Sequence, residues 1–87
     1  MWNSSIYAVI LNWNLASDTI ECIKSLQTAG LPLDQVILVD NGSTDNSLEE
    51  LVFTLGPTIK YAPLTENLGF AGGVNVGIRY ALQAGAE

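Results

Sequence analysis

Hydrophobic residues along the chain follow two patterns, short continuous runs and stripes with helical spacing. Runs of strand length cover residues 6–11, 33–40 and 58–62, and polar residues or proline follow each of them. An apolar run without polar alternation is typical of a strand covered on both faces, as in a parallel sheet. The second run is the clearest case, because it ends abruptly at Asp40 and the turn dipeptide Asn41-Gly42.

Stripes of apolar residues with a period near 3.6 predict a helix after each strand. The first helix is expected over residues 18–29, where Asp18 and Glu21 have the spacing of a capping box. The second covers residues 48–55, and the third ends near residue 84. Each stripe is assigned to the core: Ile20, Ile23, Leu26 and Ala29; Leu48, Leu51, Val52 and Leu55; Val74, Ile78, Ala81 and Leu82. The order β-α-β-α-β-α predicts an α/β fold with a three-stranded parallel, Rossmann-like sheet and flanking helices.

Length and charge limit what such a domain can do. With 87 residues the chain has room for one small domain, and no apolar run approaches the roughly 20 residues that cross a bilayer. A net charge of −6 with three cationic residues leaves no basic patch for nucleic acid. The single cysteine, Cys22, falls in an apolar helical pattern and is expected to be buried in a reducing compartment. Residues 1–5 show no signal-peptide pattern.

Candidate binding residues lie in the loops that follow the three strands, since ligands of open α/β sheets bind at the carboxyl ends of the strands. They are Asn12, Trp13 and Asn14; Asp40, Asn41 and Ser43; and Asn67, Gly69, Gly72, Gly73 and Asn75. Trp13 offers a surface for a planar base, and Asp40 offers an acceptor for a ring N–H. The glycines would let backbone amides approach phosphate at the start of the third helix.

Each feature also has a purely structural interpretation. Asp40 could satisfy loop amides and Trp13 could serve packing. Asn41 could shape a turn, and Ser43, Thr44 and Asp45 could each cap the second helix. The glycines could let the third helix pack tightly on the sheet, and Asn75 could face solvent.

Several familiar sites are excluded by spacing or composition. The glycine segment 69–74 is not G-x-G-x-x-G, and no P-loop occurs. The chain has no histidine and one cysteine, which excludes histidine-based triads and cysteine zinc sites. No catalytic residue and no metal ligand is assigned.

Together, residues 9–14, 39–45 and 66–77 resemble the N-terminal part of a family-2 glycosyltransferase of the GT-A fold, in particular its rhamnosyltransferase-like branch. The resemblance covers about residues 7–85. It implies a dTDP- or UDP-sugar donor, with Asp40 accepting from the N3–H of uracil or thymine and the glycine segment near the diphosphate. The parent enzyme would transfer a sugar such as rhamnose, with inversion, to a saccharide or lipid-linked acceptor in polysaccharide biosynthesis.

Two departures from the family pattern limit what residues 1–87 are expected to do. Val74 stands where many members carry a basic residue, and the acidic metal-binding motif of the family follows a fourth strand. We therefore expect a single truncated domain that binds donor weakly and is itself inactive. Mg or Mn would be needed by the full-length parent only, and the fragment would bind none. The expected location is cytoplasmic, with a membrane-peripheral parent as an option.

If the strand order follows the family, the first strand is left as an exposed apolar edge. Such an edge favours self-association through residues 6–11. Two other functions stay open: a non-catalytic α/β interaction module whose loops are only turns and caps, and a dinucleotide-binding oxidoreductase domain.

Overall fold

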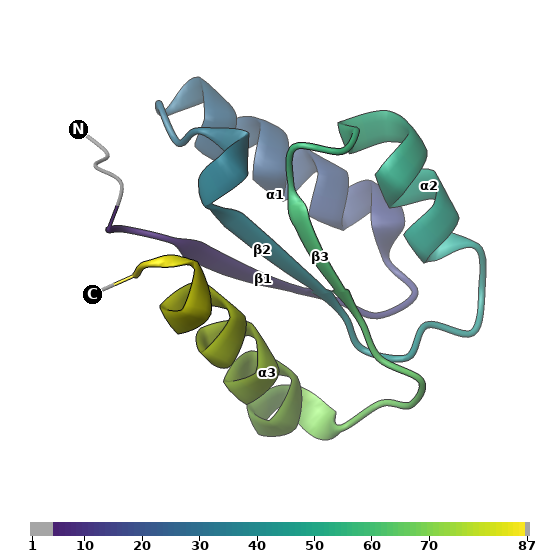
Figure 1. Cartoon of the computed structure of the whole chain (residues 1–87). Coiled ribbons are helices and arrows are strands. Elements are labelled where there is room, and N and C mark those ends of the chain that lie inside the picture. The colour runs from purple at the N-terminus through teal and green to yellow at the C-terminus, as the bar shows by residue number, and fades with distance from the viewer. Residues whose placement is uncertain (1–4, 87) are drawn as a thin grey trace.

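The computed structural model describes residues 5–86, so the signal-peptide prediction falls on residues that lie almost entirely outside this range. Its helices and strands alternate along the chain as the sequence predicts (Figure 1). They are β1 (Ala8–Asn12), α1 (Ala16–Thr28), the 3-10 turn η1 (Leu33–Gln35), β2 (Val36–Asp40), α2 (Ser47–Leu55), β3 (Lys60–Pro63) and α3 (Gly69–Ala84).

The three strands form one parallel sheet in the order β1-β2-β3, which confirms the predicted fold class. Helices α1 and α2 pack together on one face, and α3 covers the other (Figure 1). The register places Asn12 beside Asp40 and Asp40 beside Pro63. The carboxyl ends of all three strands therefore lie at one edge of the sheet, where the loops with the candidate residues begin.

Strand β2 runs through the middle of the core, and all five of its residues are buried. Val36 and Leu38 belong to the hydrophobic cluster under α1 and α2, whereas Ile37 and Val39 belong to the cluster under α3. Successive side chains of a strand point to opposite faces, so a strand covered on both faces needs apolar residues throughout. This explains why the run has no polar alternation.

Helix α3 lies close to the sheet because small residues face it. A Cβ at Gly77 would overlap the side chain of Val9 and lie 3.1 Å from Cγ2 of Val39. A Cβ at Gly73 would lie 2.5 Å from Cδ1 of Leu11. The tight-packing interpretation of the glycines is therefore correct for Gly73.

The predicted apolar face of α3 is correct for Ala81, which is buried, but wrong for Ile78 and Leu82. Its buried residues are Gly73, Val76, Gly77 and Ala81, whereas Ile78 and Leu82 are 45% and 59% exposed. The helix turns its small residues toward the sheet, because only they allow the close approach, and the larger apolar side chains are displaced sideways. The helix also begins at Gly69, so the glycine segment lies within its first turns.

Three further expectations fail in helices α1 and α2. Helix α1 begins at Ala16 without a side-chain cap, so Asp18 lies inside its first turn and the capping box is not formed. Cys22 is exposed, because α1 buries Ala16, Thr19 and Ile23 instead. Val52, on the predicted core stripe of α2, is 43% exposed.

Strand β1 is an edge strand, as predicted, and its outer side has no strand partner within residues 5–86. The hydroxyl of Tyr7, just before it, donates to the carbonyl of Ala84 at 3.0 Å, which joins the start of β1 to the end of α3.

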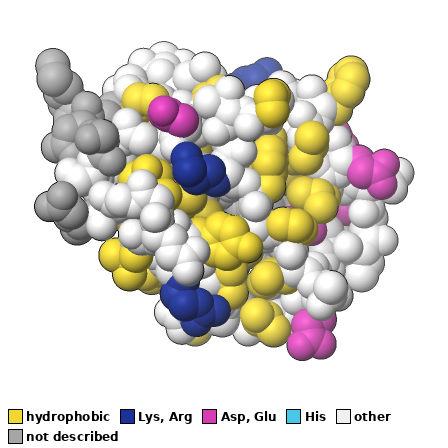
Figure 2. Space-filling view, viewed as in Figure 1, with side chains coloured by type: hydrophobic (Ala, Val, Ile, Leu, Met, Phe, Trp, Pro, Cys, Tyr) yellow, Lys and Arg dark blue, Asp and Glu magenta, His cyan; other side chains and the backbone are white. Residues whose placement is uncertain are grey.

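Hydrophobic side chains spread over much of the visible face between a few charged ones (Figure 2). Among the described residues, no helix combines the length and hydrophobicity needed to span a membrane.

Candidate functional site

The first two loops of the carboxyl edge are joined by a buried carboxylate. The side-chain amide of Asn12, at the end of β1, donates from Nδ2 to Oδ1 of Asp40 at 3.0 Å. The hydroxyl of Ser43 donates to the same oxygen at 2.6 Å, and the Ser43 backbone N–H lies 3.3 Å from Oδ2. Oδ1 of Asp40 therefore accepts two bonds and Oδ2 only one long bond, although the residue is just 4% exposed.

Thr19 belongs to this network and was not predicted from the sequence. Its hydroxyl, on α1, donates to Oδ1 of Asn12 at 2.6 Å. A signal for it exists, because Thr19 lies three residues after Ala16 and four before Ile23, on the buried stripe of α1. A polar residue on such a stripe needs a hydrogen-bond partner.

Asn14 holds the first loop against the second in a left-handed conformation, with φ of 53°. Its backbone N–H donates to the Ser43 hydroxyl at 3.0 Å, and its side-chain oxygen accepts from the backbone N–H of Thr44 at 2.9 Å. Its Nδ2 donates to the Thr44 hydroxyl at 3.1 Å. Trp13, in contrast, is 47% exposed, so the predicted surface for a planar base is accessible.

Asn41 joins β2 to the third loop. Its Nδ2 donates to Oδ1 of Asn67 at 3.2 Å and to the carbonyl of Gly69 at 3.1 Å. Its Oδ1 accepts from the backbone N–H of Leu68 at 2.9 Å. A single asparagine, 2% exposed, thereby fixes the point at which α3 begins. Its role in the free protein is structural.

Gly42 brings the second and third loops into direct backbone contact. Its φ is +72°, and a Cβ there would lie 2.7 Å from Cα of Glu66 and 2.6 Å from the backbone nitrogen of Asn67. Only glycine combines that conformation with that approach. The turn interpretation of Asn41-Gly42 is correct, and the turn also sets the distance between the loops.

Several residues at the start of α3 are exposed at this edge. Gly69 and Asn75 are exposed and Gly72 is half-buried, whereas Gly73 is buried. The backbone N–H of Gly69 donates to Oδ1 of Asn67 at 2.7 Å. The structure therefore brings most of the predicted residues to one edge, with Gly73 beneath the surface.

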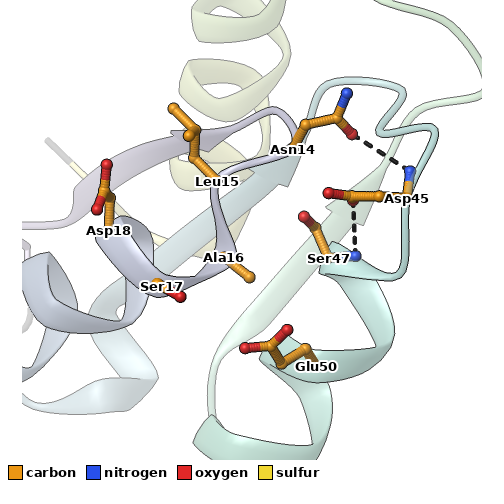
Figure 3. A pocket seen from close by; sticks show the side chains of 8 residues that line it. All are labelled: Asn14, Leu15, Ala16, Ser17, Asp18, Asp45, Ser47 and Glu50. Atoms are coloured by element: carbon orange, nitrogen blue, oxygen red, sulfur yellow. Dashed lines mark hydrogen bonds between the residues drawn. The ribbon is translucent and has the colours of Figure 1, made fainter.

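A cavity of about 220 Å³ lies beside this edge, between the first turns of α1 and α2 (Figure 3). Of the predicted site residues, only Asn14 lines it. Asp18, Asp45 and Glu50 also line it, so its charge disfavours phosphate. The cavity is therefore a poor place for the diphosphate of a nucleotide.

Asp45 is the best-connected acid of that cavity. Hydrogen bonds from the side chain and backbone N–H of Ser47 lower the pKa of its carboxyl, and the backbone bond measures 2.8 Å (Figure 3). Of the residues predicted to cap α2, Asp45 accepts from the backbone N–H of Ser47 at the start of the helix. Ser43 does not cap the helix, because its hydroxyl donates to Asp40. Within residues 5–86 no three acidic or cysteine side chains are arranged to hold a metal ion.

Comparisons with known proteins gave one match. Residues 7–83 match the family described as glycosyl transferase family 2. Neither the comparison with curated proteins nor that with solved structures found a match.

Proposed function

The chain belongs to glycosyl transferase family 2 and has a glycosyltransferase-like role with a nucleotide-sugar donor and an acceptor; from this premise we propose that residues 1–87 form the donor-binding half of an inverting enzyme. The observation that carries the proposal is the set of hydrogen bonds that ties three polar loops together at the carboxyl edge of the sheet. That edge is where open α/β sheets bind ligands.

The base of the nucleotide is read by Asp40 in this proposal. Oδ1 is occupied by Asn12 and Ser43, whereas Oδ2 has one long internal bond and keeps acceptor capacity. Uracil and thymine present an N3–H donor, which suits this oxygen. The exposed indole of Trp13 supplies the stacking surface, next to Asn12 and Asn14.

The ribose and diphosphate would lie along the third loop, near Asn67, Gly69 and the segment 72–75. The positive end of the helix dipole favours an anion there, although the amides of Leu68 and Gly69 already donate to Asn41 and Asn67. Val74 adds no positive charge, however, so we expect weak binding by residues 1–87 alone, in the millimolar range of about 4 kcal/mol.

The finer features of the parent enzyme are proposals from the same family pattern. The donor would be a dTDP- or UDP-sugar, with rhamnose as the leading sugar, and the acceptor a saccharide or a lipid-linked saccharide. The family implies Mg or Mn, but the described residues offer no matching ligand set, so nothing proposed for residues 1–87 depends on a metal. We propose that these residues do not transfer sugar by themselves.

A titration monitored by backbone amide shifts tests the donor-binding proposal. UDP and dTDP should shift the resonances of residues 12–14, 40–43 and 67–75, and NAD should not. Shifts confined to other parts of the chain, or a preference for NAD, would contradict the proposal and in the second case favour the oxidoreductase alternative.

Asp40→Asn sharpens that test. The two shorter bonds, from Asn12 and from the Ser43 hydroxyl, reach Oδ1, so the new carbonyl would remain there and the NH₂ would take the place of Oδ2, with loss of the long bond from the Ser43 backbone N–H. The variant would present a donor to the base and lose its preference for UDP over CDP, whose N3 is an acceptor. Asp34→Asn is the matched control, because Asp34 is exposed at the opposite end of β2. Asp40→Asn binding UDP like the control would refute the role of Asp40.

The alternative of a non-catalytic interaction module is favoured by one observation. No buried side-chain polar atom among the described residues lacks a hydrogen-bond partner, so the carboxyl edge is complete as a set of turns and caps. This alternative predicts that no nucleotide causes shifts at the edge, even at millimolar concentration.

We also propose self-association through the edge of β1. Residues 6–11 carry no charged residue or proline that would discourage pairing with another chain. The wild type should form larger species with rising concentration in sedimentation. Ile6→Lys should suppress them, because Ile6 is exposed just before β1, and Phe53→Lys on α2 should not. A wild type that stays monomeric at high concentration would contradict the proposal.

A further inference from the structure

We propose that Thr19 is a positioning residue that holds Asn12 against one oxygen of Asp40 and so keeps the other oxygen free for the base. The inference rests on the proposed function and adds a specificity determinant to it. Thr19 lies on α1 and its hydroxyl bonds to Asn12, so its effect on Asp40 passes through Asn12.

The direction of every hydrogen bond in this network is fixed by chemistry. A side-chain amide oxygen can only accept, so the proton of the Thr19 hydroxyl must point at Oδ1 of Asn12. The NH₂ of Asn12 then faces Oδ1 of Asp40 at 3.0 Å and the Ser43 hydroxyl at 3.3 Å. The carboxylate of Asp40 can only accept, so it selects this orientation of the Asn12 amide, and the Thr19 hydroxyl anchors the amide in it.

Because the three residues are buried, loss of the hydrogen bond from Thr19 to Asn12 would not be made up by water. Thr19, Asn12 and Asp40 are 6%, 1% and 4% exposed, so water cannot readily replace a missing partner. The Thr19 hydroxyl also donates outside its own helix, to the end of β1. A threonine that served the helix alone would bond to the carbonyl one turn earlier, as Thr28 does to Lys24 at 3.0 Å.

The consequence for recognition of the base follows from the number of hydrogen bonds that each oxygen of Asp40 already accepts. With the Asn12 amide fixed, Oδ1 of Asp40 is saturated and Oδ2 is the oxygen that can accept from uracil. If the amide is not fixed, Asp40 loses a steady donor at Oδ1 and can rotate. UDP should then bind less tightly, whereas CDP, which has no N3–H, should be unaffected.

Thr19→Val is the test variant, since valine has the same shape without the hydroxyl. We expect its UDP dissociation constant to rise about fivefold, the size of one lost neutral hydrogen bond, with that of CDP unchanged. Thr19→Ser should keep the wild-type ratio of UDP to CDP affinity. Thr28→Val, which removes an exposed hydroxyl from the same helix, is the matched control. A merely structural role for Thr19 would weaken both nucleotides equally and would overturn the inference.

Side-chain amide resonances separate this inference from the proposed function. In the free wild type, the NH₂ protons of Asn12 should exchange with solvent far more slowly than those of the exposed Asn75, a comparison that stands even if Thr19→Val fails to fold. Equal exchange rates would overturn the inference. If the exchange of Asn12 is slow but the wild type shows no preference for UDP, the proposed function fails, and the inference that rests on it fails with it. If the wild type prefers UDP and Thr19→Val keeps that preference, only the inference fails.

Discussion

Replacing Gly42 with alanine tests the backbone contact between the loops that follow β2 and β3. Two costs combine at this position. The φ of +72° is unfavourable for any residue with a Cβ, by about 1–2 kcal/mol. The added Cβ would also lie 2.6 Å from the backbone nitrogen of Asn67 and 2.7 Å from Cα of Glu66. Both are backbone atoms, which cannot rotate away as a flexible side chain could.

The expected loss of stability follows from these terms. Overpacking against atoms that cannot move away costs about 1–3 kcal/mol, in addition to the strain. Alanine also restricts the unfolded chain, which returns about 0.4–1 kcal/mol. The net destabilisation of Gly42→Ala is therefore about 2–4 kcal/mol, a large part of the roughly 4–13 kcal/mol that a chain of this length commonly has.

Urea unfolding followed by circular dichroism measures this loss, and Gly85→Ala is the matched control. Gly85 also has a positive φ, +116°, but a Cβ there would meet nothing within 4 Å. The control should lose about 1 kcal/mol from strain alone. If Gly42→Ala is no more destabilised than Gly85→Ala, the two loops are not in the contact described, and Gly42 does not set the distance between them.

Three further outcomes are expected. Ser47→Ala should raise the lowered pKa of Asp45 toward the ordinary value of about 3.9 in an NMR titration. A lowered pKa stabilises the folded protein fully when the pH is above the ordinary pKa of an aspartate, and this stabilisation is lost as the pH falls through the lowered pKa of Asp45. The variant should therefore lose less stability in acid than the wild type. Tyr61→Phe should cost about 1 kcal/mol in urea unfolding by removing the 2.7 Å bond to the carbonyl of Gly56. Burial raises the pKa of Tyr61, so that variant should also lack the loss of stability seen as pH rises through the raised value. Asn41→Ala should cost about 2–3 kcal/mol and speed amide exchange at the start of α3, and unchanged exchange there would contradict its role.

The strands were predictable because a continuous run of hydrophobic residues directly indicates a strand that is buried on both faces. The uninterrupted run that ends at Asp40 corresponds to β2, the strand with clusters on both faces. The face of α3 was not fully predictable from hydrophobicity, because two of its four buried residues, Gly73 and Gly77, are glycines. Glycine carries no apolar signal, and its value here lies in the distance it allows, which exists only once Val9 and Val39 face the helix.

The candidate site was predictable in position but not in connection. Polar residues after parallel strands must share an edge, so Asn12, Asp40 and Asn67 could be grouped from their order alone. Which of them bond to one another depends on register and on side-chain direction. Asn12 lies beside Asp40 in the register of the sheet, whereas Asn67 bonds to Asn41. Thr19 bonds to Asn12 from α1, the helix that connects β1 to β2.

The two interpretations of Asp40, loop organiser and base reader, are compatible because its two oxygens have different surroundings. A carboxylate has about four lone-pair positions, and Asn12 and Ser43 use those of Oδ1 while one long bond reaches Oδ2. The bonds that organise the loops therefore hold the carboxylate in place with Oδ2 available as an acceptor, and the structural role is a condition for the recognition that we propose.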